Sequence, residues 1–98
     1  MVHVFIRHKV ADFNRWKAVF DSAYEMRRSG GELSARMFLS QGDPGKLELL
    51  CEWDTLDRAR QFFEQPVLKS AMQQAGVVGV PEVEFMEEIH LLRRTHAD

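Results

Sequence analysis

The sequence predicts an α+β fold in the order strand, helix, strand, strand, helix, strand. Four stretches alternate apolar and polar residues with period 2, as half-buried strands do, and two stretches repeat apolar residues near period 3.6, as helices do. The 98 residues leave room for one core, so we expect a single domain over residues 1–98. A chain of this order and length usually forms a ferredoxin-like sandwich, an antiparallel sheet of order 4-1-3-2 with both helices on one face.

The first strand and helix are predicted from residues 2–31. A strand over Val2–Val10 alternates, and its apolar face includes one polar residue, His8. Asp12 can cap the following helix through its carboxylate, and Gly30-Gly31 can end it. The buried stripe of this helix is expected to consist of Phe13, Trp16, Val19, Phe20, Ala23 and Met26.

A hairpin is expected next, because the turn-forming residues 42–45 separate two alternating runs. The second strand covers Leu33–Ser40, with Leu33, Ala35, Met37 and Leu39 on one face. The third strand places Leu47, Leu49, Cys51 and Trp53 on one face.

The second helix is capped by Asp54 or Thr55 and is broken by Pro66. Its apolar positions are Leu56, Ala59, Phe62 and Phe63. A further helical piece is expected over 67–74, an apolar loop over 76–81, and a last strand over 83–92 with Val83, Phe85, Glu87, Ile89 and Leu91 aligned. The tail after Arg94 is expected to fray.

The second face of the sheet predicts both the strand order and an assembly. In the order 4-1-3-2, its charges alternate acidic, basic, acidic, basic from strand to strand, and each opposite pair contributes about 0.2–1 kcal/mol. The same face carries one large apolar residue on each strand, which a solvated face does not need. We therefore expect a homodimer whose interface contains Phe5, Phe38, Leu50 and Met86.

Composition excludes several classes of protein. The net charge of −2 offers no field for nucleic acid or an acidic membrane, and Arg27-Arg28 and Arg93-Arg94 are interpreted as solvated ends of elements. No stretch is apolar for long enough to suggest a signal peptide or a membrane span, so a cytoplasmic location is expected. The one cysteine, Cys51, is expected to be buried. His3, His8, His90 and His96 show no metal-ligand spacing, so no metal or other cofactor is expected.

Two polar residues interrupt the apolar strand faces, and they are the candidate catalytic residues. A register in which paired residue numbers sum to about 95 would set His8 beside Glu87. Such a pair could perform general-base chemistry, or it could be a buried pair with a structural role only. The candidate substrate-binding residues, each of which could equally be simple core, are Trp16, Phe20, Tyr24, Trp53, Phe62 and Met72.

Three segments carry a family resemblance: the run from His8 to Lys17, Glu52-Trp53-Asp54, and the stretch from Ala75 to Glu82. With them the chain resembles the antibiotic biosynthesis monooxygenase-like family of the dimeric α/β-barrel superfamily. This resemblance implies a homodimer with one pocket per subunit between helices and sheet. Some members of the family oxidise polycyclic phenols or quinols without metal or flavin, whereas others degrade haem, and some barrel relatives are polyketide cyclases.

The haem-degrading branch fits poorly, because Met72 and Phe62 stand where that branch places its ligand histidine and a tryptophan. The preferred hypothesis is therefore a cofactor-independent monooxygenase-like enzyme that acts on a small aromatic or quinol-type compound, with His8 as base. The alternatives are a non-catalytic dimer that binds a small hydrophobic molecule, and a polyketide-cyclase-like enzyme.

Overall fold

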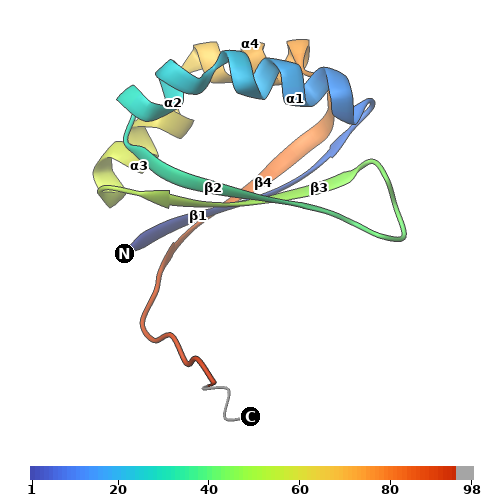
Figure 1. Cartoon of the computed structure of the whole chain (residues 1–98). Coiled ribbons are helices and arrows are strands. Elements are labelled where there is room, and N and C mark those ends of the chain that lie inside the picture. Colours follow the sequence, from blue (N-terminus) through green and yellow to red (C-terminus); the bar gives the residue numbers. More distant parts are fainter. Residues whose placement is uncertain (95–98) are drawn as a thin grey trace.

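A computed structural model of the chain describes residues 1–94. Its elements are β1 (Val2–Val10), α1 (Phe13–Ser22), α2 (Tyr24–Ser29), β2 (Glu32–Leu39), β3 (Lys46–Trp53), α3 (Leu56–Phe63), α4 (Pro66–Gln74) and β4 (Val77–Glu87). All strand pairs are antiparallel and the sheet order is β2-β3-β1-β4, which is the predicted 4-1-3-2 read from the other edge. The helices arch over one face of the sheet and leave the other face bare (Figure 1). The predicted ferredoxin-like α+β fold is confirmed.

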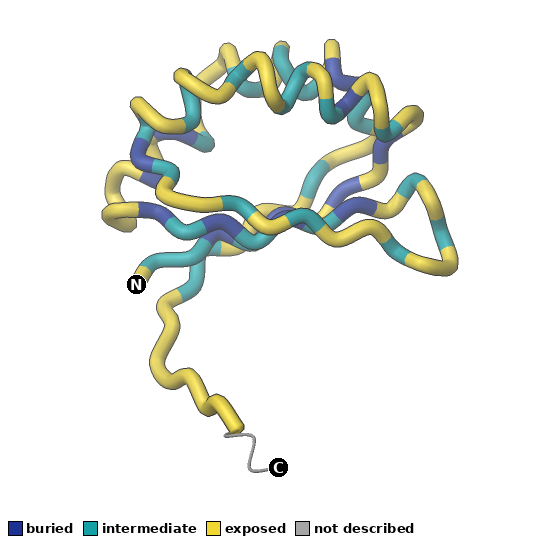
Figure 2. Tube along the Cα trace, viewed as in Figure 1, coloured by how far each residue is buried: buried dark blue, intermediate teal, exposed yellow. Residues whose placement is uncertain are grey.

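The core lies between the sheet and the helix layer, where the buried segments of the chain concentrate (Figure 2). Strand β3 contributes most to it, because Leu47, Leu49, Cys51 and Trp53 are all buried, as their alternation predicts. The Trp53 indole Nε1 also donates to the carbonyl oxygen of Gly30 at 2.8 Å, which fastens the end of α2 to the sheet.

The helices begin where the sequence predicts and are more broken than expected. The carboxylate of Asp12 accepts from the backbone N–H groups of Asn14 and Arg15, at 2.9 and 3.3 Å. The single helix expected before Gly30 is interrupted at Ala23, which separates α1 from α2. Thr55 caps α3, and α4 starts at Pro66 itself. Among residues 1–94, no helix has the length and apolar character needed to cross a membrane.

The edge strand β2 differs from the prediction because of a bulge. The register against β3 shifts between Glu32 and Ser34, so that Leu33 is the extra residue. Leu33 was predicted to belong to the apolar face, yet it is 60% exposed. The bulge instead aligns Glu32 with Trp53, a residue on the helix-covered side of the sheet. A carboxylate therefore takes a core position that the alternation assigned to leucine.

The other edge strand, β4, begins and ends earlier than predicted. The expected loop over 76–81 is wrong in part, because Val77 and Val78 pair with Val10 and Lys9. The register then shifts, and residues 79–81 form a bulge that contains Gly79 with a φ of 75°. The expected continuation to residue 92 is also wrong, because β4 ends at Glu87 and residues 88–94 leave the sheet (Figure 1).

Candidate functional site

A cavity of about 80 Å³ lies between the sheet and the helices. Five of the six predicted substrate-binding residues line it: Trp16, Phe20, Trp53, Phe62 and Met72. The sixth, Tyr24, is 56% exposed and lies outside the cavity. It lines a shallow depression at the β2 edge, to which Phe20 and Met37 also belong.

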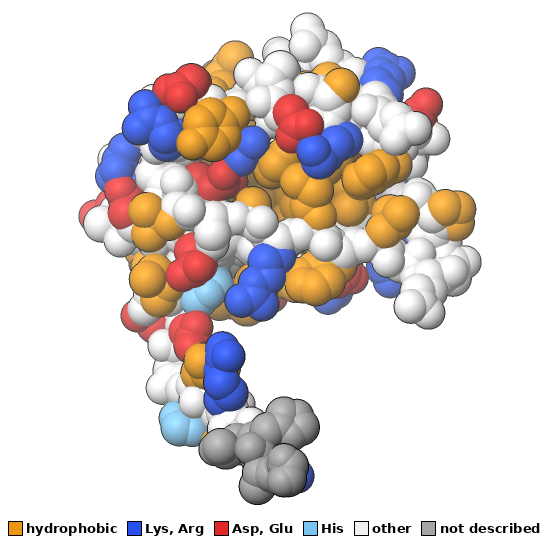
Figure 3. Space-filling model, viewed as in Figure 1, with side chains coloured by type: hydrophobic (Ala, Val, Ile, Leu, Met, Phe, Trp, Pro, Cys, Tyr) orange, Lys and Arg blue, Asp and Glu red, His pale blue; other side chains and the backbone are white. Residues whose placement is uncertain are grey.

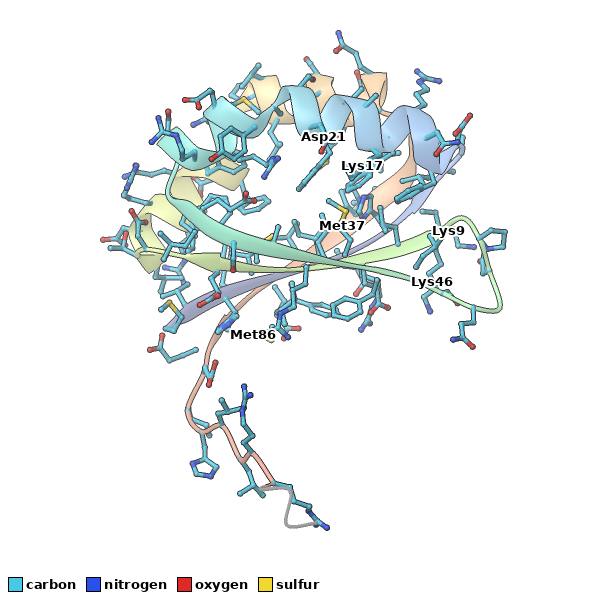
Figure 4. All side chains as sticks on the ribbon, viewed as in Figure 1. Lys9, Lys17, Asp21, Met37, Lys46 and Met86 are labelled. Carbon is cyan, nitrogen blue, oxygen red and sulfur yellow. The ribbon has the colours of Figure 1, made fainter. Side chains whose placement is uncertain are left out.

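The depression at the β2 edge adjoins the cavity. The space-filling view shows an apolar hollow there, between the helix layer and the sheet (Figure 3). Met37 points from β2 toward the helix layer, while Lys17 and Asp21 of α1 form an ion pair above it, at 2.7 Å (Figure 4). Phe20, Arg27 and Glu32 line both the depression and the cavity.

Aromatic rings form the walls of the cavity. The Trp16 and Phe20 rings stack with centroids 4.9 Å apart, and the Trp53 and Phe62 rings lie 5.1 Å apart. The imidazole of His8 lies 5.7 Å from the Trp16 ring. Flat, apolar walls of this kind suit a flat, apolar molecule.

His8 is a buried polar group that faces this apolar cavity. It is only 7% exposed, and its Nδ1 atom has no hydrogen-bond partner among residues 1–94. Burial lowers the pKa of His8 below its usual value of 6.5, and the neighbouring backbone of Leu47 opposes that shift in part. The imidazole is therefore neutral at pH 7 and can accept a proton.

The register predicted to join His8 and Glu87 is wrong. Paired residues on β1 and β4 sum to 89 over most of their length, so Glu87 pairs with Val2 rather than with His8. Its carboxylate lies 3.3 Å from the amino group of Met1, and its side chain is 64% exposed. On the other side of the bulge at residues 79–81 the sum is 87, so neither register brings Glu87 to His8. Glu87 therefore does not share the cavity with His8.

A buried ion pair that the sequence did not reveal lies on the wall of the same cavity. Arg27 of α2 and Glu32 of β2 both line it and are bonded to each other, with side chains 11% and 9% exposed. Arg27 also donates to the carbonyl oxygen of Phe20 at 3.0 Å, and its guanidinium lies 3.6 Å from the Phe20 ring centre. The interpretation of Arg27 as a solvated helix end is wrong, because α2 turns this side chain inward.

The charges of this pair are perturbed by their surroundings. Burial raises the pKa of Glu32, while Arg27 acts in the opposite direction. Burial, with the nearby Glu32 carboxylate, also raises the pKa of Cys51 to about 12. The thiol is thus protonated and buried, as predicted, and is a poor nucleophile.

A metal site would need several ligands in one place. Among residues 1–94, no three His, Cys, Asp or Glu side chains gather as a metal ion requires. One of the four histidines considered from the sequence, His96, lies outside the described residues.

The four predicted interface residues lie on the bare face of the sheet. Phe5 pairs with Leu50 across β1 and β3, and Phe38 is 48% exposed. Met86 projects from this face, away from the helices (Figure 4). The predicted charge alternation is present in part, because Arg7 on β1 bonds Glu48 on β3 at 3.2 Å.

Comparison with known proteins establishes the fold. No protein-family model matches the sequence, and no curated protein matches it. Among solved structures, a cofactor-independent oxygenase, SnoaB from Streptomyces nogalater, has a TM-score of 0.76 and 14% identity, covering 95% of this chain and 97% of its own. An antibiotic biosynthesis monooxygenase has a TM-score of 0.68 and 16% identity, covering 92% and 100%. A conserved protein from Methanosarcina mazei Go1 has a TM-score of 0.69 and 14% identity, covering 89% and 91%. The resemblance to antibiotic biosynthesis monooxygenase-like proteins is confirmed at the level of the fold.

Proposed function

We propose that this protein is a cofactor-independent monooxygenase-like enzyme that acts on a small quinol-type aromatic compound. The observation that carries the proposal is His8, a neutral imidazole with an unpartnered nitrogen that faces an apolar, aromatic-walled cavity. A general base must be unprotonated at the working pH and within reach of the proton it takes. The fold shared with a cofactor-independent oxygenase supports the same reaction class.

In the proposed reaction, a quinol and one O₂ give a hydroxyquinone and one water. His8 accepts the proton of a quinol hydroxyl, and the resulting electron-rich quinolate reduces O₂. One oxygen atom bonds to the ring carbon, and the other leaves as water with two hydrogens of the substrate. The substrate supplies all four electrons, so the chain itself needs to provide only a base, a dry cavity and orientation.

Oxygen consumption with a panel of single-ring quinols tests this proposal. Wild type should consume O₂ above the rate of autoxidation, and His8→Ala should lose at least about a hundredfold in rate, the usual contribution of a general base. Glu87→Gln is the matched control, because Glu87, the last residue of β4, lies beside Met1 and pairs with Val2, at the opposite end of β1 from His8. An His8→Ala enzyme with undiminished turnover would remove the proposed base.

We also propose that the bare face of the sheet is covered by a second copy of this chain. Phe5, Phe38, Leu50 and Met86 supply one apolar residue on each strand, and the helices leave this face uncovered (Figure 1). Beyond β4, residues 88–94 carry further exposed apolar side chains, with Ile89 93% and Leu92 84% exposed. Large apolar side chains left without cover are typical of an interface.

Non-catalytic binding of a small hydrophobic molecule is the second candidate function. The apolar walls of the cavity favour it as much as they favour catalysis. Turnover separates the two functions, because a binding protein would retain the molecule unchanged after incubation with O₂.

A further inference from the structure

We infer that the cavity binds a molecule with one ring and two opposed oxygens, in which Arg27 holds a carbonyl or other neutral acceptor oxygen and His8 holds a hydroxyl. The inference rests on the proposed function only in taking the cavity as the ligand site. It adds the recognition of the second oxygen, the residue responsible for it, and the size of the ring system.

Arg27 has a buried Nε–H donor that the described residues leave unused. Its Nη1 donates to Glu32 and its Nη2 donates to the carbonyl oxygen of Phe20, whereas its buried Nε has no partner among residues 1–94. Buried N–H groups are almost always bonded, so an unbonded one on a cavity wall indicates an acceptor supplied by a ligand. His8 Nδ1 is the other buried, unpartnered side-chain atom of these residues, and His8 lines the same cavity.

The pairing of Arg27 with Glu32 indicates that the acceptor is uncharged. The carboxylate already neutralises the guanidinium, and both side chains are close to fully buried. A ligand anion would therefore place a second negative charge beside Glu32 in a region of low dielectric. A ketone, quinone or phenol oxygen meets the Nε–H donor without that cost.

The two polar atoms are separated along the cavity, which determines where the oxygens of the ligand stand. His8 lies against the Trp16 ring and the Arg27 guanidinium lies against the Phe20 ring, and these two rings are stacked on each other. A ligand that bonds to both residues must therefore extend along this pair of rings. A ring with oxygens on opposite carbons can lie there and offer one oxygen to each residue.

The cavity is smaller than the space that one ring needs, so it must widen for any ring, and the least widening favours a single ring over two. A cavity of about 150 Å³ holds one benzene, and this cavity is about 80 Å³. Met26 and Met72, which are unbranched and adaptable, line it and allow it to widen for one ring. Two or more fused rings would require the aromatic walls themselves to separate.

Binding under argon to the full-length protein tests the inference without any turnover. The probes are 4-hydroxyacetophenone, 4-ethylphenol, which lacks the carbonyl, and 4-methylacetophenone, which lacks the hydroxyl. Isothermal titration should show wild type binding the first probe about three- to tenfold more tightly than either of the others. 6-Hydroxy-2-acetonaphthone, with two fused rings, should bind more weakly than the first probe.

The variants assign each oxygen to a residue. Arg27→Lys keeps a positive charge beside Glu32 but removes the Nε–H donor. In this variant 4-hydroxyacetophenone should no longer bind more tightly than 4-ethylphenol, but it should still bind more tightly than 4-methylacetophenone. In His8→Phe, 4-hydroxyacetophenone should no longer bind more tightly than 4-methylacetophenone, but it should still bind more tightly than 4-ethylphenol. Arg28→Lys, at an exposed neighbouring position, is the matched control and should change neither. If Arg27→Lys does not fold, the paired replacement of Arg27 by Met and Glu32 by Leu serves the same purpose.

Each outcome has a defined meaning. Loss of the two advantages in the two separate variants supports the inference. Equal affinity for the three single-ring probes, tighter binding of the two-ring probe, no binding at millimolar concentration, or an equal loss for all probes in Arg27→Lys overturns it. A protein that shows the expected pattern yet consumes no O₂ with any quinol refutes the oxygenase proposal alone. A protein that oxidises quinols without the pattern refutes this inference alone.

Discussion

Replacing Arg27 by Met should destabilise the fold far more than its position in a short surface helix suggests. The change leaves the Glu32 carboxylate buried without its partner, since the two side chains are 11% and 9% exposed in the pair. Removing one member of a buried ion pair typically costs about 3–5 kcal/mol. At roughly 5 °C per kcal/mol for a domain of this size, the Tm should fall by about 15–25 °C.

The double replacement of Arg27 by Met and Glu32 by Leu separates the lost pair from lost packing. A buried pair replaced by apolar residues of similar volume is often neutral or stabilising, so this variant should recover to within about 1 kcal/mol of wild type. Urea unfolding followed by the fluorescence of the two buried tryptophans, Trp16 and Trp53, measures these values. Protein concentration is held constant, because self-association would add to apparent stability.

The pH dependence of Arg27→Met gives a second, independent check. Burial already raises the pKa of Glu32, and the loss of Arg27 removes the group that opposes this. In the folded variant the Glu32 carboxyl then keeps its proton at pH values above its ordinary pKa, where the same carboxyl in the unfolded chain has released it. The free energy of unfolding should therefore increase as the pH falls from 7 toward 4.5. Arg28→Met should leave stability close to wild type. If the double variant proves as unstable as Arg27→Met, or if acid destabilises Arg27→Met more than it does wild type, the account of a buried carboxylate is refuted.

Three further predictions concern the assembly, His8 and bound groups. Leu50→Arg should convert a wild-type dimer into monomer or aggregate in sedimentation at micromolar concentration, and a monomeric wild type would refute the proposed interface. Since the folded-state pKa of His8 lies below 6.5, stability should be lost as the pH falls from 6.5 through that value, and His8→Phe should flatten this part of the wild-type curve in urea unfolding. The purified protein should carry no stoichiometric iron or haem, because Met72 stands where the haem-degrading branch of the family that the sequence resembles places its ligand histidine. Elemental analysis, and haem titration with a search for ring-opened products, test this.

The sheet could be predicted from the sequence because its central strands obey a strict period. Every second residue of β3 is buried, and the span of β1 is the predicted Val2–Val10. The helix starts could be predicted because a cap is local: Asp12 and Thr55 bond backbone groups two or three residues away. The aromatic cavity wall follows from the apolar stripe of the first helix, which is why the sequence predicts Trp16 and Phe20.

The edge strands could not be predicted to the same accuracy, because a bulge leaves no periodic signal. The extra residue Leu33 reads in sequence as the first member of the apolar face. One extra residue moves the side chains before it in the strand to the opposite face of the sheet. The alternation therefore does not predict Glu32 as a cavity residue. Arg27 was missed for a related reason, since a pair of arginines before two glycines is typical of a solvated helix end.

Two polar residues of the cavity wall, Glu32 and His8, lie where the sheet departs from regular pairing. The bulge in β2 aligns Glu32 with Trp53 on the covered face, where it bonds to Arg27 of α2. The bulge in β4 leaves His8 opposite residues 79–81 with no paired residue on that side. A regular sheet would place apolar residues at these points on its covered face. Bulges are over-represented next to active sites because they re-aim a side chain that regular pairing would direct elsewhere. One unpartnered atom, His8 Nδ1, belongs to a residue opposite a bulge, and the other, Arg27 Nε, belongs to the residue bonded to Glu32. Core packing would be better served by apolar side chains at these positions. The irregularities that defeat prediction from the sequence therefore lie beside the polar groups that we propose to bind the ligand.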